Sequence, residues 1–169
     1  MQSPRTIKGM LDFAEDLGGV DMDALRDGLE IVRLHGQVER VVEHDLVAWG
    51  LTARQVEIVE SLYHNTDRTM TPADLSEEVD LTRSAMTGAL DTLEKLGHTA
   101  RGLHPSDRRK VAVRLTPSGD DFASKLLARR YERIAQSMKR LSQRERAVLI
   151  SIYKKVLSFM ADHREPERP

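Results

Sequence analysis

Apolar residues in the first third of the chain recur every three or four positions, the spacing of one face of an α-helix. In the N-terminal arm, residues 1–21, this spacing together with Gly18-Gly19 predicts a short accessory helix. Over residues 22–50 it predicts one long helix that ends at Gly50, a residue suited to a helix C-terminus. The stripe of the long helix consists of Ile31, His35, Val38, Val42 and Leu46.

Residues 51–116 carry the start signals of three shorter helices. Thr52 with Gln55 forms a capping box, Thr71-Pro72 is a cap followed by proline, and Thr82 is a third cap. The helix after Thr71 ends at Asp80, and the next runs over about 83–96. Two short helices joined by three residues predict a helix-turn-helix, with Asp80 in a left-handed conformation at the turn.

The repeat then changes from helical spacing to that of β-strands. Residues 99–103 and 111–115 indicate two strands, and the connection between them, HPSDRRK, contains turn formers and three cations. A hairpin after a helix-turn-helix is a wing, so we expect a wing over about 99–115 with a basic tip.

The last third, residues 117–163, is again helical and is followed by a frayed tail over 164–169. Its apolar residues follow a heptad-like seam that a second copy of the chain would cover economically. The seam consists of Leu127, Tyr131, Ile134, Met138, Leu149, Ile152, Val156 and Phe159. The predicted fold is mainly α with a small β-wing: a winged helix-turn-helix with long dimerisation helices at both ends of the chain.

The net charge of −1 hides an uneven distribution. Residues 1–65 hold 6 basic and 12 acidic side chains, whereas residues 95–114 hold six basic side chains against Asp107 alone. DNA responds to the local patch, although a charged run fits a solvated surface equally well.

The composition narrows the classes of function. The sequence has no cysteine, which excludes disulfides and cysteine chemistry. We find no Gly-rich phosphate loop and no set of catalytic side chains, so we predict neither an enzyme nor a bound cofactor. The sequence also lacks a membrane-length apolar run and a signal-peptide pattern, so we expect a cytoplasmic protein with no membrane partner.

Three motifs in order resemble the MarR family of winged helix-turn-helix regulators. They are Leu51-Thr52 with Gln55, the wing triplet Asp107-Arg108-Arg109, and Leu115-Thr116 with Gly119. The resemblance spans roughly residues 25–159 and implies a DNA-binding regulator. One departure is Gly88, because the family often has Thr-Arg where this chain has Thr87-Gly88. Either glycine permits a close backbone approach or the DNA contact moves to Arg83.

The resemblance and the chemistry of the side chains together suggest a set of DNA contacts. Hydroxyls and an arginine at the start of the second helix suit phosphates and base edges, and wing cations suit a minor groove. The predicted contacts are Thr82, Arg83, Ser84, Thr87, Arg108, Arg109 and Lys110. We expect Asp107 to brace the wing by pairing with an arginine.

The resemblance further implies a homodimeric repressor that binds a pseudo-palindromic operator on double-stranded DNA and is relieved by a small aromatic or anionic effector. The candidate effector pocket comprises His35, Val38, Val59 and Tyr63. Two alternatives remain open: a winged-helix dimer that acts through protein contacts, and a metal-responsive regulator that uses histidines such as His35, His44 and His64.

Overall fold

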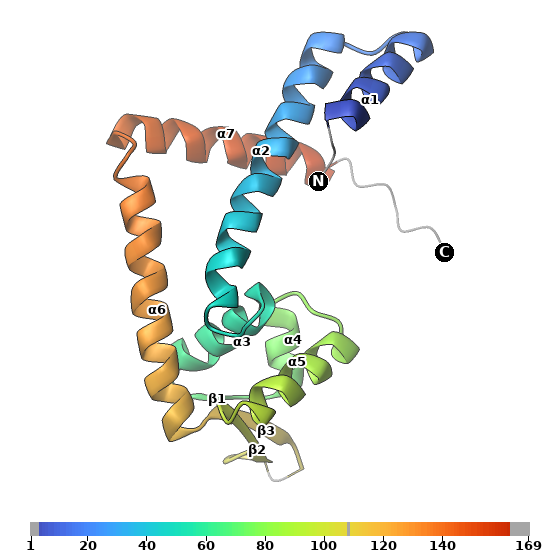
Figure 1. The fold of residues 1–169 in the computed structure, drawn as a ribbon. Helices are drawn as coiled ribbons and strands as arrows, with labels where there is room; N and C mark the ends of the chain where they lie inside the picture. Colours follow the sequence, from blue (N-terminus) through green and yellow to red (C-terminus); the bar gives the residue numbers. More distant parts are fainter. Residues whose placement is uncertain (1–3, 108, 163–169) are drawn as a thin grey trace. The chain divides into compact units, whose positions relative to one another are not determined.

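The computed structural model describes residues 4–107 and 109–162 of the chain, which divides after Gly119 into two compact units (Figure 1). The first unit holds five helices and a small sheet among its described residues. Its elements are α1 (Pro4–Leu17), α2 (Met22–Val47), α3 (Ala53–His64), β1 (Thr69–Met70), α4 (Pro72–Glu78), α5 (Arg83–Lys95), β2 (Thr99–Leu103) and β3 (Val111–Leu115). Helix α6 (Pro117–Met138) begins at the boundary and α7 (Gln143–Asp162) follows it.

The predicted helix starts are confirmed by their capping hydrogen bonds. The Thr52 hydroxyl accepts from the Gln55 N–H at 3.3 Å, and the Gln55 side chain accepts from the Thr52 N–H at 2.9 Å. Thr71 and Asp74 make the same reciprocal pair, and Thr82 caps α5. Each cap satisfies N–H groups that a helix otherwise leaves unpaired at its start.

The turn between α4 and α5 depends on one residue in the left-handed region. Asp80 has φ 49° there, as the sequence predicts. Aspartate tolerates this conformation better than most residues because its short polar side chain bonds locally. The turn sets the direction in which α5 leaves α4.

The wing strands lie where the sequence predicts, in an antiparallel sheet of order β1-β3-β2. Thr99 pairs with Leu115 at the base of the wing, and Leu103 pairs with Val111 farther out. Strand β1, which the sequence analysis missed, pairs Thr69 with Arg114. It has two residues, too few for an alternating pattern to reveal.

The core of the first unit lies between α3, α4, α5 and β3. Its side chains are Val56, Ile58, Val59, Leu62, Leu75, Met86, Leu90, Leu93 and Val113, each no more than 1% exposed. Burying a side chain of this size stabilises a fold by about 1.5–3 kcal/mol. Because three of these residues belong to α5, the core fixes which side of α5 faces outward.

The motif Leu115-Thr116 with Gly119 closes the lobe. The Thr116 hydroxyl donates to the Gly97 carbonyl at 2.6 Å and accepts from the Gly119 N–H at 2.9 Å. A Cβ at Gly119 would lie 1.9 Å from the His98 carbonyl oxygen, so only glycine fits. The exit of the wing is thereby fastened to the exit of α5.

The second unit consists of α6 and α7 joined by a short turn. Ser142 and Glu145 form a capping box, and the Arg146 guanidinium donates to the Leu141 carbonyl at 2.6 Å. No helix in the described ranges combines the length and apolarity needed to cross a membrane.

Candidate nucleic-acid interface

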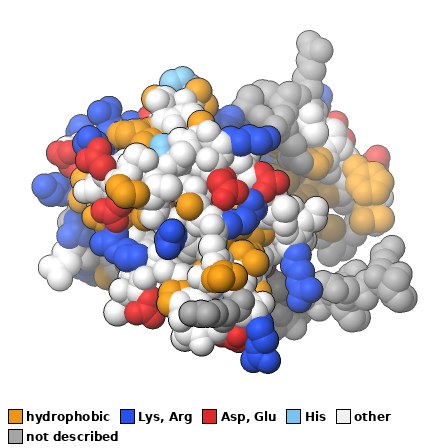
Figure 2. Space-filling view, turned by 90° about the horizontal axis from the view of Figure 1, so that it is seen from below, with side chains coloured by type: hydrophobic (Ala, Val, Ile, Leu, Met, Phe, Trp, Pro, Cys, Tyr) orange, Lys and Arg blue, Asp and Glu red, His pale blue; other side chains and the backbone are white. Residues whose placement is uncertain are grey.

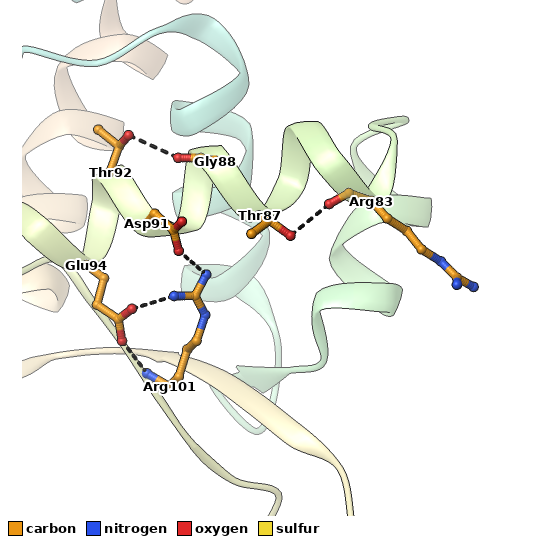
Figure 3. Close-up of polar contacts among 7 residues, drawn as sticks. All are labelled: Arg83, Thr87, Gly88, Asp91, Thr92, Glu94 and Arg101. Carbon is orange, nitrogen blue, oxygen red and sulfur yellow. Dashed lines mark hydrogen bonds and ion pairs between the residues drawn. The ribbon is translucent and has the colours of Figure 1, made fainter.

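Helix α5 separates a buried side from an exposed side. Met86, Leu90 and Leu93 are buried, whereas Arg83 and Thr87 are exposed on the outward side. The Thr87 hydroxyl donates to the Arg83 carbonyl at 2.9 Å, and the Arg83 side chain extends away from the helix (Figure 3). The two other predicted contacts on this helix, Thr82 and Ser84, are exposed as well. The fold therefore presents the helix residues that the sequence analysis selected.

A hollow of about 510 Å³ joins the exposed start of α5 to the wing. Arg83 and Thr87 line it from α5, Lys110 lines it from the wing, and Pro72 and Ala73 line it from α4. Two cations and a hydroxyl beside apolar walls match the chemistry of a DNA strand, whose phosphates alternate with apolar sugar faces.

One carboxylate, that of Asp74, also lines this hollow. Hydrogen bonds from Thr71, first from its side chain and then from its backbone, lower the pKa of Asp74. The neighbouring charges of Lys110 and His104 lower it further. The carboxylate therefore stays ionised and offsets part of the positive charge of Lys110.

The tip of the wing contains the predicted brace. An Asp107 carboxylate oxygen accepts from the backbone N–H of Arg109 at 3.1 Å and from its guanidinium Nε at 3.2 Å. These bonds, the backbone one first, lower the pKa of Asp107. The Arg109 side chain is 92% exposed, so it keeps donors for another partner. Arg108, also predicted as a DNA contact, lies outside the described residues.

Sequence reasoning missed a clamp between the wing and α5. Arg101 on β2 pairs with Asp91 at 2.7 Å and with Glu94 at 2.6 Å, both on α5 (Figure 3). Glu94 also accepts from the Arg101 backbone N–H at 3.0 Å. These bonds raise the pKa of Arg101, and the side-chain hydrogen bond to Asp91 contributes most to that rise. The spacing of Asp91 and Glu94 puts both carboxylates on one side of α5, but their partner becomes evident only when the hairpin folds back.

Charges on this part of the molecule are mixed. Figure 2 looks along the molecule from the end at which Figure 1 draws the sheet, and Lys and Arg side chains lie there with Asp and Glu among them. Among the described residues, positive charge therefore lies at separate positions with acidic side chains between them.

The four residues of the predicted effector pocket differ in exposure. His35 and Val38 are exposed on α2, Val59 is fully buried, and Tyr63 is half-buried with the Arg68 guanidinium 4.2 Å from its ring centre. A hollow of about 370 Å³ adjoins His35, but its lining residues all belong to α2. Val59 thus has no surface to offer a ligand in this conformation.

The seam predicted for dimerisation is exposed in the single chain with one exception. Ile134 is 50% exposed and Phe159 is 62% exposed, whereas Leu127 is 2% exposed. Leu127 is already packed within its own chain and has little surface left for a partner. The members exposed by at least 40% are Tyr131, Ile134, Met138, Leu149, Ile152, Val156 and Phe159.

Histidine, aspartate and glutamate are the side chains of this chain that could hold a metal ion. Over the residues that the structure describes, no three of these side chains come together as a metal ion would need. His35 lies 3.3 Å from Glu39 on the same helix, one turn away.

Known proteins match both the sequence and the fold. A sequence profile described as the MarR family matches residues 51–111, the helix-turn-helix and most of the wing. The HTH-type transcriptional repressor YetL of Bacillus subtilis is 25% identical over 145 residues, which cover 86% of this chain and 87% of YetL. The chain is thus similar to the MarR family, most specifically over residues 51–111.

Solved structures of MarR-family proteins share the arrangement. A mutant MarR from E. coli complexed with operator DNA matches 83% of this chain and 99% of its own, with a TM-score of 0.66 and 26% identity. The match to AbsC from Streptomyces coelicolor covers 86% of this chain and 97% of AbsC, with a TM-score of 0.68. The two sequences are 22% identical, so this is a likeness in fold alone. The predicted winged helix-turn-helix fold is thus confirmed. The protein is a DNA-binding transcriptional regulator similar to this family and not an enzyme.

Proposed function

We propose that the protein acts as a homodimer on a pseudo-palindromic operator. Helix α5 enters the major groove and uses Arg83, Ser84 and Thr87, with Thr82 at its cap. Arg109, Lys110 and Arg108 of the wing meet the adjacent backbone and minor groove. The half-site centres are about one helical turn, or about 10 base pairs, apart. We also propose a cytoplasmic location, where bacterial chromosomal DNA lies.

The hollow shared by α5 and the wing carries this proposal. Arg83 and Thr87 come from one element and Lys110 from another, yet they line the same space. A DNA strand that runs past the start of α5 toward the wing would contact all three side chains. The E. coli MarR mutant with the same fold is complexed with operator DNA, which supports the same kind of partner here.

Dimerisation is supported by the apolar side chains that a single chain leaves exposed. They lie on α6 and α7, and along α2, where Ile31 and Val38 are more than half exposed. A second copy burying these rows would remove a large apolar surface from water. A two-fold dimer also presents two copies of α5 to the two half-sites.

We further propose that the protein is a repressor whose DNA binding is relieved by a small aromatic or anionic molecule. The repressor role is supported by the name of YetL. The candidate site consists of His35, Val38 and Tyr63, and His35 lines a hollow on the surface of α2. An effector there acts by binding one conformation of the dimer more tightly than another. In the favoured conformation, the spacing between the two DNA-binding parts does not match the operator.

A salt titration tests the DNA interface. Wild type should bind a duplex selected from a random pool, and the logarithm of the binding constant should fall steeply with the logarithm of salt concentration. Arg109→Ala with Lys110→Ala should flatten that slope by about two units. Lys154→Ala with Lys155→Ala on α7 removes the same charge and should leave the slope unchanged. A wild type without salt-dependent DNA binding would favour a regulator that works through protein contacts.

A further inference from the structure

Gly88 lies on the outward side of α5, in the middle of the helix proposed to read DNA. Successive residues of an α-helix are about 100° apart, so Gly88 points away from Met86 and Leu90, which face the core. Gly88 itself is exposed. It therefore occupies the part of α5 that a groove would approach most directly.

Neither the backbone nor the packing of this chain requires glycine at position 88. The residue sits inside a regular helix. Apart from its chain neighbours and the adjacent backbone of its own helix, no described heavy atom lies within 4 Å of where its Cβ would be. Gly119 shows the opposite case, because there a Cβ would collide with the His98 carbonyl. Glycine inside a helix is unfavourable relative to alanine, so Gly88 makes the free protein less stable without an internal reason.

The side chains on either side of Gly88 lie close to the helix backbone and do not project from it. The Thr92 hydroxyl donates to the Gly88 carbonyl at 3.0 Å, and the Thr87 hydroxyl donates to the Arg83 carbonyl (Figure 3). Both side chains thus bend back onto the helix backbone. Arg101 holds the Asp91 carboxylate at 2.7 Å and compensates its negative charge.

We propose that Gly88 determines specificity by leaving a gap that the edge of a base pair fills in the operator complex. The occupant is double-stranded DNA, and the inference rests on the proposed function of α5. A side chain at this position would hold the helix away from the groove floor and would shift contacts from Arg83 and Thr87. The protein then prefers, at that base pair, the base whose edge fits against the exposed helix backbone at Gly88.

Gly88→Ala tests the proposal because one methyl group has opposite effects on the two states. In the free protein it should raise Tm by about 2–4 °C, the usual gain for alanine in a helix of a chain this size. In the complex it should weaken binding to the duplex selected by wild type by about tenfold, a loss typical of one disturbed base contact. The slope of binding against salt should stay the same, since no phosphate contact is lost. A repeated selection with the variant should return a different base at the affected position.

Gly9→Ala is the matched control. Gly9 lies inside α1, is exposed and likewise has open space around its Cβ, so Tm should rise while DNA binding stays unchanged. Equal affinity and equal base preference for Gly88→Ala and wild type would overturn the proposal, as would a lowered Tm, which would reveal an internal packing role. If wild type selects no duplex, it is the proposed function itself that fails.

Discussion

Arg101 on β2 bonds to Glu94 on α5 twice, through its backbone N–H at 3.0 Å and through its guanidinium at 2.6 Å. A backbone bond and a side-chain bond to one carboxylate fix both the position and the rotation of the strand relative to the helix. The wing and α5 are therefore tied together, and a change in the angle of either element moves the other.

We predict that Arg101→Gln loosens the wing. The substitution leaves Asp91 and Glu94 close together without a cation, and because all three side chains are partly exposed the loss of stability should be about 1 kcal/mol. The expected fall in Tm is about 2–4 °C, and DNA affinity should drop as well. Arg114→Gln, on the exposed side of β3, is the control for Tm. Equal melting curves for Arg101→Gln and wild type would show that the clamp adds no stability.

Gly119→Ala should be among the most damaging small substitutions in the chain. Its Cβ would lie 1.9 Å from the His98 carbonyl oxygen and would force the wing exit away from the end of α5. Overpacking of this kind costs about 1–3 kcal/mol or more. Gly102→Ala, on β2 with open space at its Cβ, should be tolerated far better. Thermal unfolding of both variants makes the comparison, and equal Tm values would contradict it.

Ile134→Glu should prevent dimerisation. Ile134 is half exposed in the single chain, and a partner surface would bury the new carboxylate without a counter-charge. Sedimentation at micromolar concentration should show a dimer for wild type and a monomer or an unfolded chain for the variant. Gln136→Glu adds the same charge to the opposite side of α6 and should remain dimeric. A folded wild-type monomer would refute the dimer and the paired half-sites together.

The wing brace predicts a pH response confined to strong acid. The folded-state pKa of Asp107 lies below its ordinary value of 3.8, so the folded state favours the ionised carboxylate. Its contribution to stability is complete above that ordinary value and disappears as the pH falls through the lower folded-state pKa. An NMR titration should show the Arg109 amide shifting below pH 3.8, and Asp107→Asn should abolish the shift. A midpoint at or above 3.8 would contradict the bond between Asp107 and Arg109.

The effector proposal can be tested by ligand-induced stabilisation. A set of aromatic carboxylic acids should raise the Tm of wild type, and His35→Phe should lose that rise while keeping its own unfolding transition. Equal stabilisation of both proteins would remove His35 from the pocket. No stabilisation of either would leave the pocket without support.

Features that depend on neighbours in sequence could be predicted, and features that depend on distant partners could not. The caps at Thr52, Thr71 and Thr82 and the left-handed Asp80 are local, because each depends on residues within one turn of the chain. The partners of Arg101 lie on another element, and the pairing of β1 joins residues 69 and 114.

Burial was the other property that the pattern could not decide. Leu127 falls on the heptad-like spacing of an interface, yet it packs within its own chain. Val59 lies one helical turn from Tyr63 on α3, the spacing of two residues in one pocket wall, yet it is part of the core. Periodicity identifies an apolar face, but it does not say whether that face is covered from inside the chain or by a second molecule.

The separation of roles on α5 has a consequence for how such regulators diverge. Met86, Leu90 and Leu93 hold the helix in the core, while Arg83, Ser84 and Thr87 are exposed. Substitutions at exposed positions of this kind usually change stability by no more than about 0.5 kcal/mol. Duplicated copies of the gene could therefore acquire new operators through a few changes on one helix face and still fold as before.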